Sequence, residues 1–192
     1  MTRAIWSRES PHAGSDEQVV VALVRGGCFG LERVIGLLRR RAPTVETLNV
    51  TSGEESDESR VTISLRCGHE AAEQVAEHIR KLVDVSWAAA FPAAGGDEAA
   101  LLREFALIRV ACTSTTRREV VDAAQLFGAR AVDVTDDSIT LEISGAPETV
   151  EQLLRMLRPS GIVEVARTGR VAMPRGAGMD DGLWREEAHD QA

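Results

Sequence analysis

The chain repeats one order of expected strands and helices, and this repeat constrains its fold more than any other feature. Residues 18–92 and residues 101–171 each read as strand, helix, strand, strand, helix, strand. A βαββαβ unit folds as a four-stranded antiparallel sheet with two helices on one face. We therefore expect an α+β protein with two tandem units. The other face of each sheet needs a cover, which we expect from a partner copy or a different protein.

In the first unit, residues 19–24 form an apolar run typical of a strand covered on both faces. A glycine-containing turn is expected over residues 25–30, and a helix with one apolar face follows it. Residues 45–50 and 61–65 predict two strands, of which the second alternates like a half-buried strand. A second helix and a fourth strand complete the unit; the alternating apolar residues of that strand are Val83, Val85 and Trp87.

In the second unit, residues 105–110 predict a strand, and Thr113–Thr115 can cap the helix that follows. Two strands are expected around a tight turn at Asp136–Asp137. Pro147 suits the first turn of the last helix. Residues 161–171 close the unit with a strand.

These patterns predict the domain boundaries. We expect a disordered tail over residues 1–16, a first domain over 17–92, a linker over 93–100, a second domain over 101–174 and a tail over 175–192. The last tail holds Trp184 among acidic residues. It is interpreted as a disordered end, and a short partner-docking segment remains the alternative.

Composition excludes several classes of function. The net charge of −8 argues against nucleic-acid binding, which needs a basic face, and the chain has no Tyr for base stacking. No apolar stretch is long enough for a membrane span, and the N-terminal residues do not read as a signal peptide. The three scattered cysteines indicate a reducing compartment, so we expect a cytoplasmic protein.

The sequence shows no cluster of catalytic or metal-binding residues. Lys81 is the only lysine, and no phosphate-loop motif precedes it. His69 and His78 are not spaced as helical metal ligands. The acidic run at residues 54–58 is interpreted as solvated charge, with a divalent-cation site as the less favoured alternative. We expect no catalytic residue, no resident metal and no cofactor, which favours binding and regulation over catalysis.

The turn at residues 26–30 is the strongest candidate for a binding site. A glycine-rich turn that leads into a helix presents free backbone N–H groups and the positive end of the helix dipole. A small carboxylate such as an amino acid could bind there. The glycines could equally serve only the backbone angles of a tight turn. The residues alone leave both interpretations open.

Several longer phrases resemble one known family. Residues 131–142 (AVDVTDDSITLE) and 157–176 (LRPSGIVEVARTGRVAMPRG) resemble the small, regulatory subunit of acetolactate synthase. In the first half, the phrases at 31–38, 59–63 and 81–85 look like the same family. The resemblance runs from about residue 19 to residue 176.

This resemblance implies two ferredoxin-like units, an N-terminal ACT domain and an ACT-like C-terminal domain. Members of the family form homodimers through their ACT domains and activate a large catalytic subunit. That subunit carries thiamine diphosphate, Mg²⁺ and FAD, and it makes acetolactate for valine, leucine and isoleucine biosynthesis. Valine binds between the ACT domains as a feedback inhibitor. The alternative is a stand-alone ACT-type sensor that binds another amino acid or ligand.

The chain departs from the family at the expected effector site. The family motif is Asn-x-Pro-Gly or Asn-x-Ser-Gly, and the resemblance aligns its Asn, Pro or Ser, and Gly with Gly26, Cys28 and Phe29. A second family asparagine aligns with Thr44. The full set of candidate effector residues is Gly26, Cys28, Phe29, Gly30, Leu31 and Thr44. Each lost amide hydrogen bond costs about 1–3 kcal/mol in a buried site. We therefore expect weak or absent valine inhibition and retained activation.

Overall fold

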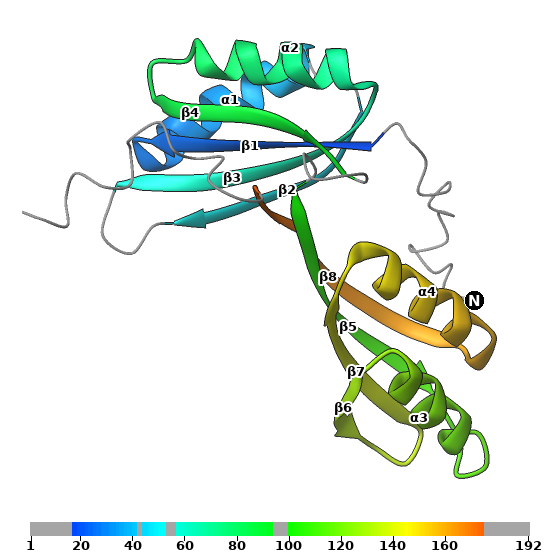
Figure 1. The fold of residues 1–192 in the computed structure, drawn as a ribbon. Helices are drawn as coiled ribbons and strands as arrows, with labels where there is room; N and C mark the ends of the chain where they lie inside the picture. Colours follow the sequence, from blue (N-terminus) through cyan, green and yellow to red (C-terminus); the bar gives the residue numbers. More distant parts are fainter. Residues whose placement is uncertain (1–16, 42–43, 53–56, 94–99, 175–192) are drawn as a thin grey trace, which may run out of the picture.

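A computed structural model describes residues 17–41, 44–52, 57–93 and 100–174. These residues form two antiparallel four-stranded sheets, each with two helices on one face, which confirms the expected α+β fold (Figure 1). The predicted tails at 1–16 and 175–192 and most of the predicted linker lie outside the described residues.

The first unit contains β1 (Glu17–Arg25), α1 (Gly27–Arg41), β2 (Thr44–Ser52), β3 (Glu58–Arg66), α2 (His69–Arg80) and β4 (Val85–Pro92). Its strand order is β2-β3-β1-β4. The apolar faces of α1 and α2 cover one side of this sheet, and Val34, Val75 and Ile79 are fully or almost fully buried there.

The second unit contains β5 (Leu101–Ala111), α3 (Arg117–Leu126), β6 (Arg130–Val134), β7 (Ser138–Gly145), α4 (Pro147–Leu157), the short 3-10 helix η1 (Arg158–Ser160) and β8 (Ile162–Met173). Its strand order, β6-β7-β5-β8, repeats that of the first unit. Ile108, Leu141 and Leu153 are fully buried in its core.

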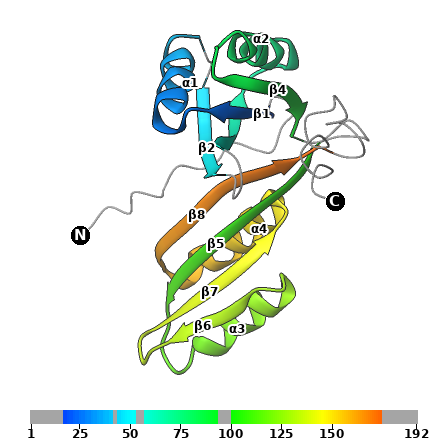
Figure 2. The ribbon, with the colours of Figure 1, turned by 90° about the vertical axis from the view of Figure 1, so that its left-hand side faces the viewer.

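The two units meet where β5 and β8 extend beyond the second sheet and cross the first one (Figure 2). We call this contact the unit junction; its buried apolar residues are Val19, Val21, Ala100, Leu102 and Ala172. The junction corrects the expectation that a partner copy or another protein covers the far face of the first sheet. Part of that face is covered by the chain's own second unit.

The junction also explains why β3 is buried on both faces. Thr62 and Ser64 were expected at a solvated face, yet their exposed fractions are only 3% and 0%. The prediction of a strand over residues 61–65 is confirmed, but the prediction that one face of this strand is solvated is wrong. A single sequence period cannot show that β8 packs against β3 from the other side.

Three local expectations were wrong in detail. The turn at residues 25–30 is shorter, because β1 ends at Arg25 and α1 already begins at Gly27. Val83 precedes β4 in a turn and is 84% exposed. The residue that caps α3 is Thr116 rather than one of residues 113–115, and its side chain makes no capping hydrogen bond.

Candidate functional site

The connection between β1 and α1 consists of one residue, Gly26, whose φ is +79°. Gly27 also has a positive φ, +54°, at the first position of the helix. The Phe29 N–H donates to the Gly26 carbonyl at 3.2 Å. Left-handed backbone angles favour glycine, so this tight entry accounts for both residues.

Gly30 has a structural role within this turn. A Cβ at residue 30 would stand 2.0 Å from the Arg25 carbonyl oxygen, so only glycine fits there. Phe29 is 78% exposed and points its bulk outward, and Cys28 is exposed. Leu31 is half-buried against the first core. The turn therefore presents an aromatic ring and a thiol to solvent.

Two ion pairs hold this end of the first unit. Arg33 Nη1 donates to Asp84 Oδ2 at 2.7 Å, and Arg25 Nε donates to Glu58 Oε1 at 2.7 Å. The Arg25 N–H also donates to the Asp84 carbonyl at 2.7 Å. These contacts join β1 to α1, to the start of β3 and to the residue before β4, so the backbone around Gly26 is fixed from two sides.

Thr44 lies far from the other candidate residues. It pairs with Arg66, which pairs with Glu17 at the start of β1, whereas Gly26 follows the last residue of β1. The nine residues of β1 span about 27 Å at 3.4 Å per step. Within one chain, the structure brings Gly26, Cys28, Phe29, Gly30 and Leu31 together and leaves Thr44 at the opposite end of the sheet.

β2 is an edge strand with exposed apolar side chains. Val45, Leu48 and Val50 are 38–40% exposed, and Ile35 on α1 is 45% exposed. An edge strand of this kind is available for pairing with another strand.

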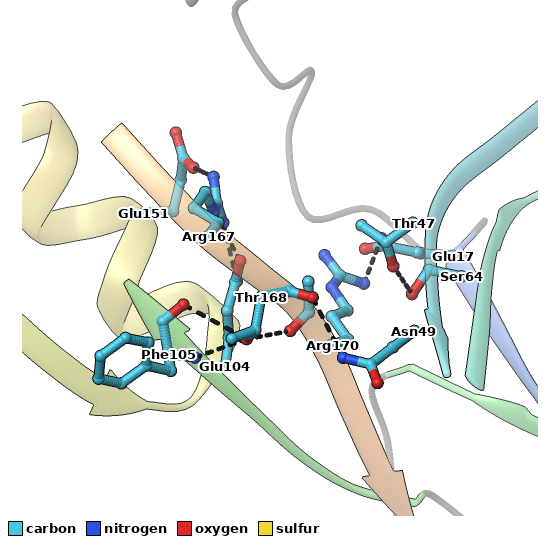
Figure 3. A network of polar contacts seen from close by, with 11 residues as sticks. Glu17, Thr47, Asn49, Ser64, Glu104, Phe105, Glu151, Arg167, Thr168 and Arg170 are labelled. Carbon is cyan, nitrogen blue, oxygen red and sulfur yellow. Dashed lines mark hydrogen bonds and ion pairs between the residues drawn. The ribbon is translucent and has the colours of Figure 1, made fainter. Parts of the chain in front are cut away.

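The opposite face of β2 contacts β8 through polar groups (Figure 3). Asn49 Nδ2 donates to the Thr168 carbonyl at 3.2 Å. Gly169, with φ +76°, lies so close to β2 that an added Cβ would stand 3.1 Å from the Thr47 Cβ. A β-bulge at this point sets Thr168 and Gly169 opposite Phe105 alone, and the Thr168 hydroxyl accepts from the Phe105 N–H at 3.2 Å. Bulges bend a strand, which lets β8 pass from one sheet to the other.

An ion pair between the buried Glu104 and the partly exposed Arg167 precedes this bulge. Glu104 is 3% exposed, and its two carboxylate oxygens accept from Arg167 Nε and Nη2 at 2.6 and 2.8 Å. Arg167 Nη1 also donates to Glu151 on α4 at 3.3 Å. Its hydrogen bond to Glu104 raises the pKa of Arg167, against the opposing effect of burial. The group therefore fastens β5, β8 and α4 where the second core meets the unit junction.

Two other arginines make contacts across the unit junction. Arg60 Nη2 donates to the Ala172 carbonyl at 2.8 Å, and burial lowers the pKa of Arg60. Arg170 pairs with Glu17 at the start of β1. Sequence reasoning missed all of these contacts. The one local signal is Glu104, a charge that falls at the same alternating positions as the buried Leu102 and Ala106.

The remaining candidates stay separate. Within the described part of the chain, no group of three or more His, Cys, Asp or Glu side chains could hold a metal ion. His69 Nδ1 lies 3.2 Å from Gln18 Oε1, and Lys81 is an exposed residue at the end of α2. Most of the acidic run at 54–58 lies outside the described residues. No helix in the described ranges is long and apolar enough to cross a membrane.

Comparison with known proteins identifies relatives along most of the chain. A family model described as the small subunit of acetolactate synthase matches residues 103–176, and an ACT-domain model matches residues 29–87. The acetolactate synthase small subunit of Mycolicibacterium smegmatis is 38% identical over 163 residues, which cover 85% of this chain and 94% of the relative. A probable acetolactate synthase small subunit of Archaeoglobus fulgidus is 36% identical, with 83% and 98% covered.

A solved structure agrees with these sequence matches. The crystal structure of the acetolactate synthase small subunit from Thermotoga maritima superposes with a TM-score of 0.74 at 29% identity. The match covers 83% of this chain and 98% of that chain. Both units therefore have counterparts in the same relative.

Proposed function

Because the chain belongs to the family of acetolactate synthase small subunits, we propose that it is the regulatory subunit that binds and activates a separate large catalytic subunit. The reaction is acetolactate formation for valine, leucine and isoleucine biosynthesis in the cytoplasm. One observation carries this proposal: relatives with that name align with both units and are themselves almost fully covered.

The chemistry is assigned to the large subunit. Thiamine diphosphate, Mg²⁺ and FAD are proposed to bind there, and no cofactor is placed in this chain.

We propose that the chain forms a homodimer through its ACT domains along β2. Two copies of this edge strand, paired antiparallel about Leu48, would set Thr44 of one copy opposite Ser52 of the other. Ser52 pairs with Ser59 at the same end of the sheet as Arg25 and Gly26. Antiparallel pairing would therefore bring Thr44 of one copy toward Gly26 of the other, which a single chain does not do.

An effector site between two such copies would have lost much of its affinity for valine. Gly26 offers no side-chain amide, and Thr44 is shorter than asparagine. Phe29 would place a ring beside the ligand. Each unmade hydrogen bond costs about 1–3 kcal/mol. We propose that activation is retained while valine binding is weakened or altered.

The test is reconstitution with the large subunit encoded in the same genome. Acetolactate formation is measured with and without this chain, across a series of valine, leucine and isoleucine concentrations. Increased activity with little response to valine is the expected result. An unchanged rate and no complex on size-exclusion chromatography would reject the proposal, and would favour the stand-alone sensor if an amino acid raised the melting temperature of the isolated chain.

A further inference from the structure

One side of the helix α1 is left exposed, away from the core. Val34 and Leu38 mark the buried side of this helix. Ile35 is 45% exposed, and Glu32 and Arg39 are also exposed. Glu32, Ile35 and Arg39 are spaced at i, i+3 and i+7, so they lie along one side of the helix. We call these three side chains the α1 stripe.

The α1 stripe lies on the side of the first unit that ends in β2. β2 and β4 are the two edge strands of the first sheet, and α2 packs against β4. Arg33 reaches toward the β4 side, because its guanidinium donates to Asp84, the residue before β4. Ile35 follows two positions later, about 200° around the helix, so the α1 stripe points away from that side.

β2 exposes apolar side chains on the same face of the sheet. Leu48 pairs with Ile63 and Val50 pairs with Val61, and both partners belong to the core under the helices. Directly paired residues point to the same face of a sheet, so Leu48 and Val50 also face the helix layer. Ile35 and these two side chains therefore belong to one edge of the first unit.

The charged members of the α1 stripe have no counter-charge in their own chain. No hydrogen bond or ion pair joins Glu32 or Arg39 to another residue of the described ranges. The two are seven positions apart, about 10 Å along the helix axis, and residues at that spacing do not meet on one helix. The α1 stripe therefore has a negative end and a positive end, with an apolar residue between them.

Such a stripe is complementary to itself when two copies meet antiparallel. Glu32 of each copy then faces Arg39 of the other, whereas a parallel arrangement would set like charges against each other. The two-fold axis that pairs β2 antiparallel with its copy also turns α1 antiparallel. Leu48 is the middle residue of β2, and Ile35 is next to the middle residue of α1, so one axis can serve both elements.

We propose that α1 packs antiparallel against α1 of a second copy, with Ile35 at the centre and an ion pair on each side of it between Glu32 of one copy and Arg39 of the other. The proposal rests on the homodimer along β2 proposed above, and it names the residues that fix its register. An edge strand alone specifies its register weakly where its exposed side chains are similar. The two symmetry-related ion pairs form in one register only.

The experiment mixes two charge-reversed chains at low ionic strength, where screening is weak. Glu32→Arg leaves positive charge at both positions, and Arg39→Glu leaves negative charge at both. Each variant alone should dimerise about tenfold more weakly than wild type, because both contacts become repulsive. An equimolar mixture should regain the affinity of wild type by forming mixed dimers, in which both contacts again join opposite charges.

Sedimentation equilibrium measures the dissociation constants, and native mass spectrometry distinguishes mixed dimers by mass. Recovery on mixing also shows that both variants are folded. Glu77→Arg and Lys81→Glu are the matched controls, because both residues are exposed at the C-terminal end of α2 on the β4 side. These controls should leave the dissociation constant unchanged, and their mixture should form mixed dimers only in the statistical proportion.

The outcomes separate this pairing from the proposals on which it rests. If Val50→Lys dissociates the wild-type dimer but neither α1 variant weakens it, the pairing of α1 is overturned and the homodimer along β2 stands. Weakened variants that do not recover on mixing would also overturn the pairing. A monomeric wild-type chain would overturn both the pairing and the homodimer. Activation of the large subunit is measured separately, so its failure is a distinct result.

Discussion

The backbone of Gly169 in β8 lies directly against the side chain of Thr47 in β2, and a Cβ on residue 169 would stand 3.1 Å from the Thr47 Cβ. This contact joins the first unit to the second unit at β2, the strand that also forms the open edge of the first sheet. The contact requires glycine at residue 169 for two reasons: a side chain there would crowd Thr47, and the φ of residue 169 is +76°.

Gly169→Ala should therefore destabilise the protein more than an ordinary glycine substitution. The left-handed backbone alone costs about 1–2 kcal/mol, and the overlap with Thr47 adds to it. Gly128→Ala is the matched control, because Gly128 has a φ of +68° and nothing within 4 Å of an added Cβ. Urea unfolding of both variants measures the difference. Equal losses of unfolding free energy would show that the Thr47 contact contributes nothing.

The contributions of Glu104 and Arg167 to the free energy of unfolding should depend on each other. Arg167→Met leaves a buried carboxylate without its partner and should lower the free energy of unfolding by about 3 kcal/mol. This is the low end of the usual range, because the Arg167 side chain is 30% exposed. The double variant Glu104→Leu with Arg167→Met should recover most of the loss. A double variant no more stable than the single one would contradict this.

The Glu104–Arg167 pair should stabilise the folded protein across the whole neutral range of pH. The pKa of Arg167 is raised in the folded protein, so its contribution is fully present below the ordinary arginine pKa and is lost only as the pH rises above it. The difference in unfolding free energy between wild type and the double variant Glu104→Leu with Arg167→Met, which leaves no unpaired carboxylate, should therefore be constant from pH 6 to pH 9.

The sequence predicted the two units well because each carries clear periodicity. The alternation in β7 and the helical spacing in α4 reflect burial inside one unit, which is a local property. The unit junction could not be predicted in this way. Thr62, Ser64 and Gly169 read as surface residues, and they are buried only because two distant segments meet.

The candidate effector residues also divide into those that local sequence patterns could place and those that they could not. The tight turn at Gly26 was predicted as a turn, although α1 begins earlier than expected. Thr44 was grouped with that turn by the family resemblance alone. The register of β2 on β3 places it at the other end of the sheet, and no local pattern carries that information.

Restoring the family motif should restore valine binding. Asn tolerates left-handed angles better than most residues, and an added Cβ at Gly26 meets nothing closer than 3.8 Å. Gly26→Asn combined with Phe29→Gly should therefore fold and should tighten valine binding about tenfold or more. Isothermal titration with valine measures this. Gly128→Asn, which places an asparagine at a distant left-handed position, should leave binding unchanged. If the motif variant bound valine no more tightly than wild type, the turn at Gly26 would not be part of the effector site.

The edge strand β2 should determine the oligomeric state. Val50→Lys places a charge on this edge and should shift the proposed dimer toward monomer, because an edge lysine opposes strand pairing. Val132→Lys makes the same change on β6, the edge of the other sheet, and should have no effect. Sedimentation equilibrium distinguishes these outcomes. Dissociation by the β6 variant instead would move the interface to the second unit.

The most direct test of the regulatory role is the rate of acetolactate formation by the large subunit from the same genome, titrated with this chain. A saturable increase in rate that reaches its plateau near one small subunit per large subunit is the predicted result. A rate that does not change at any ratio, with both proteins folded, would contradict the account.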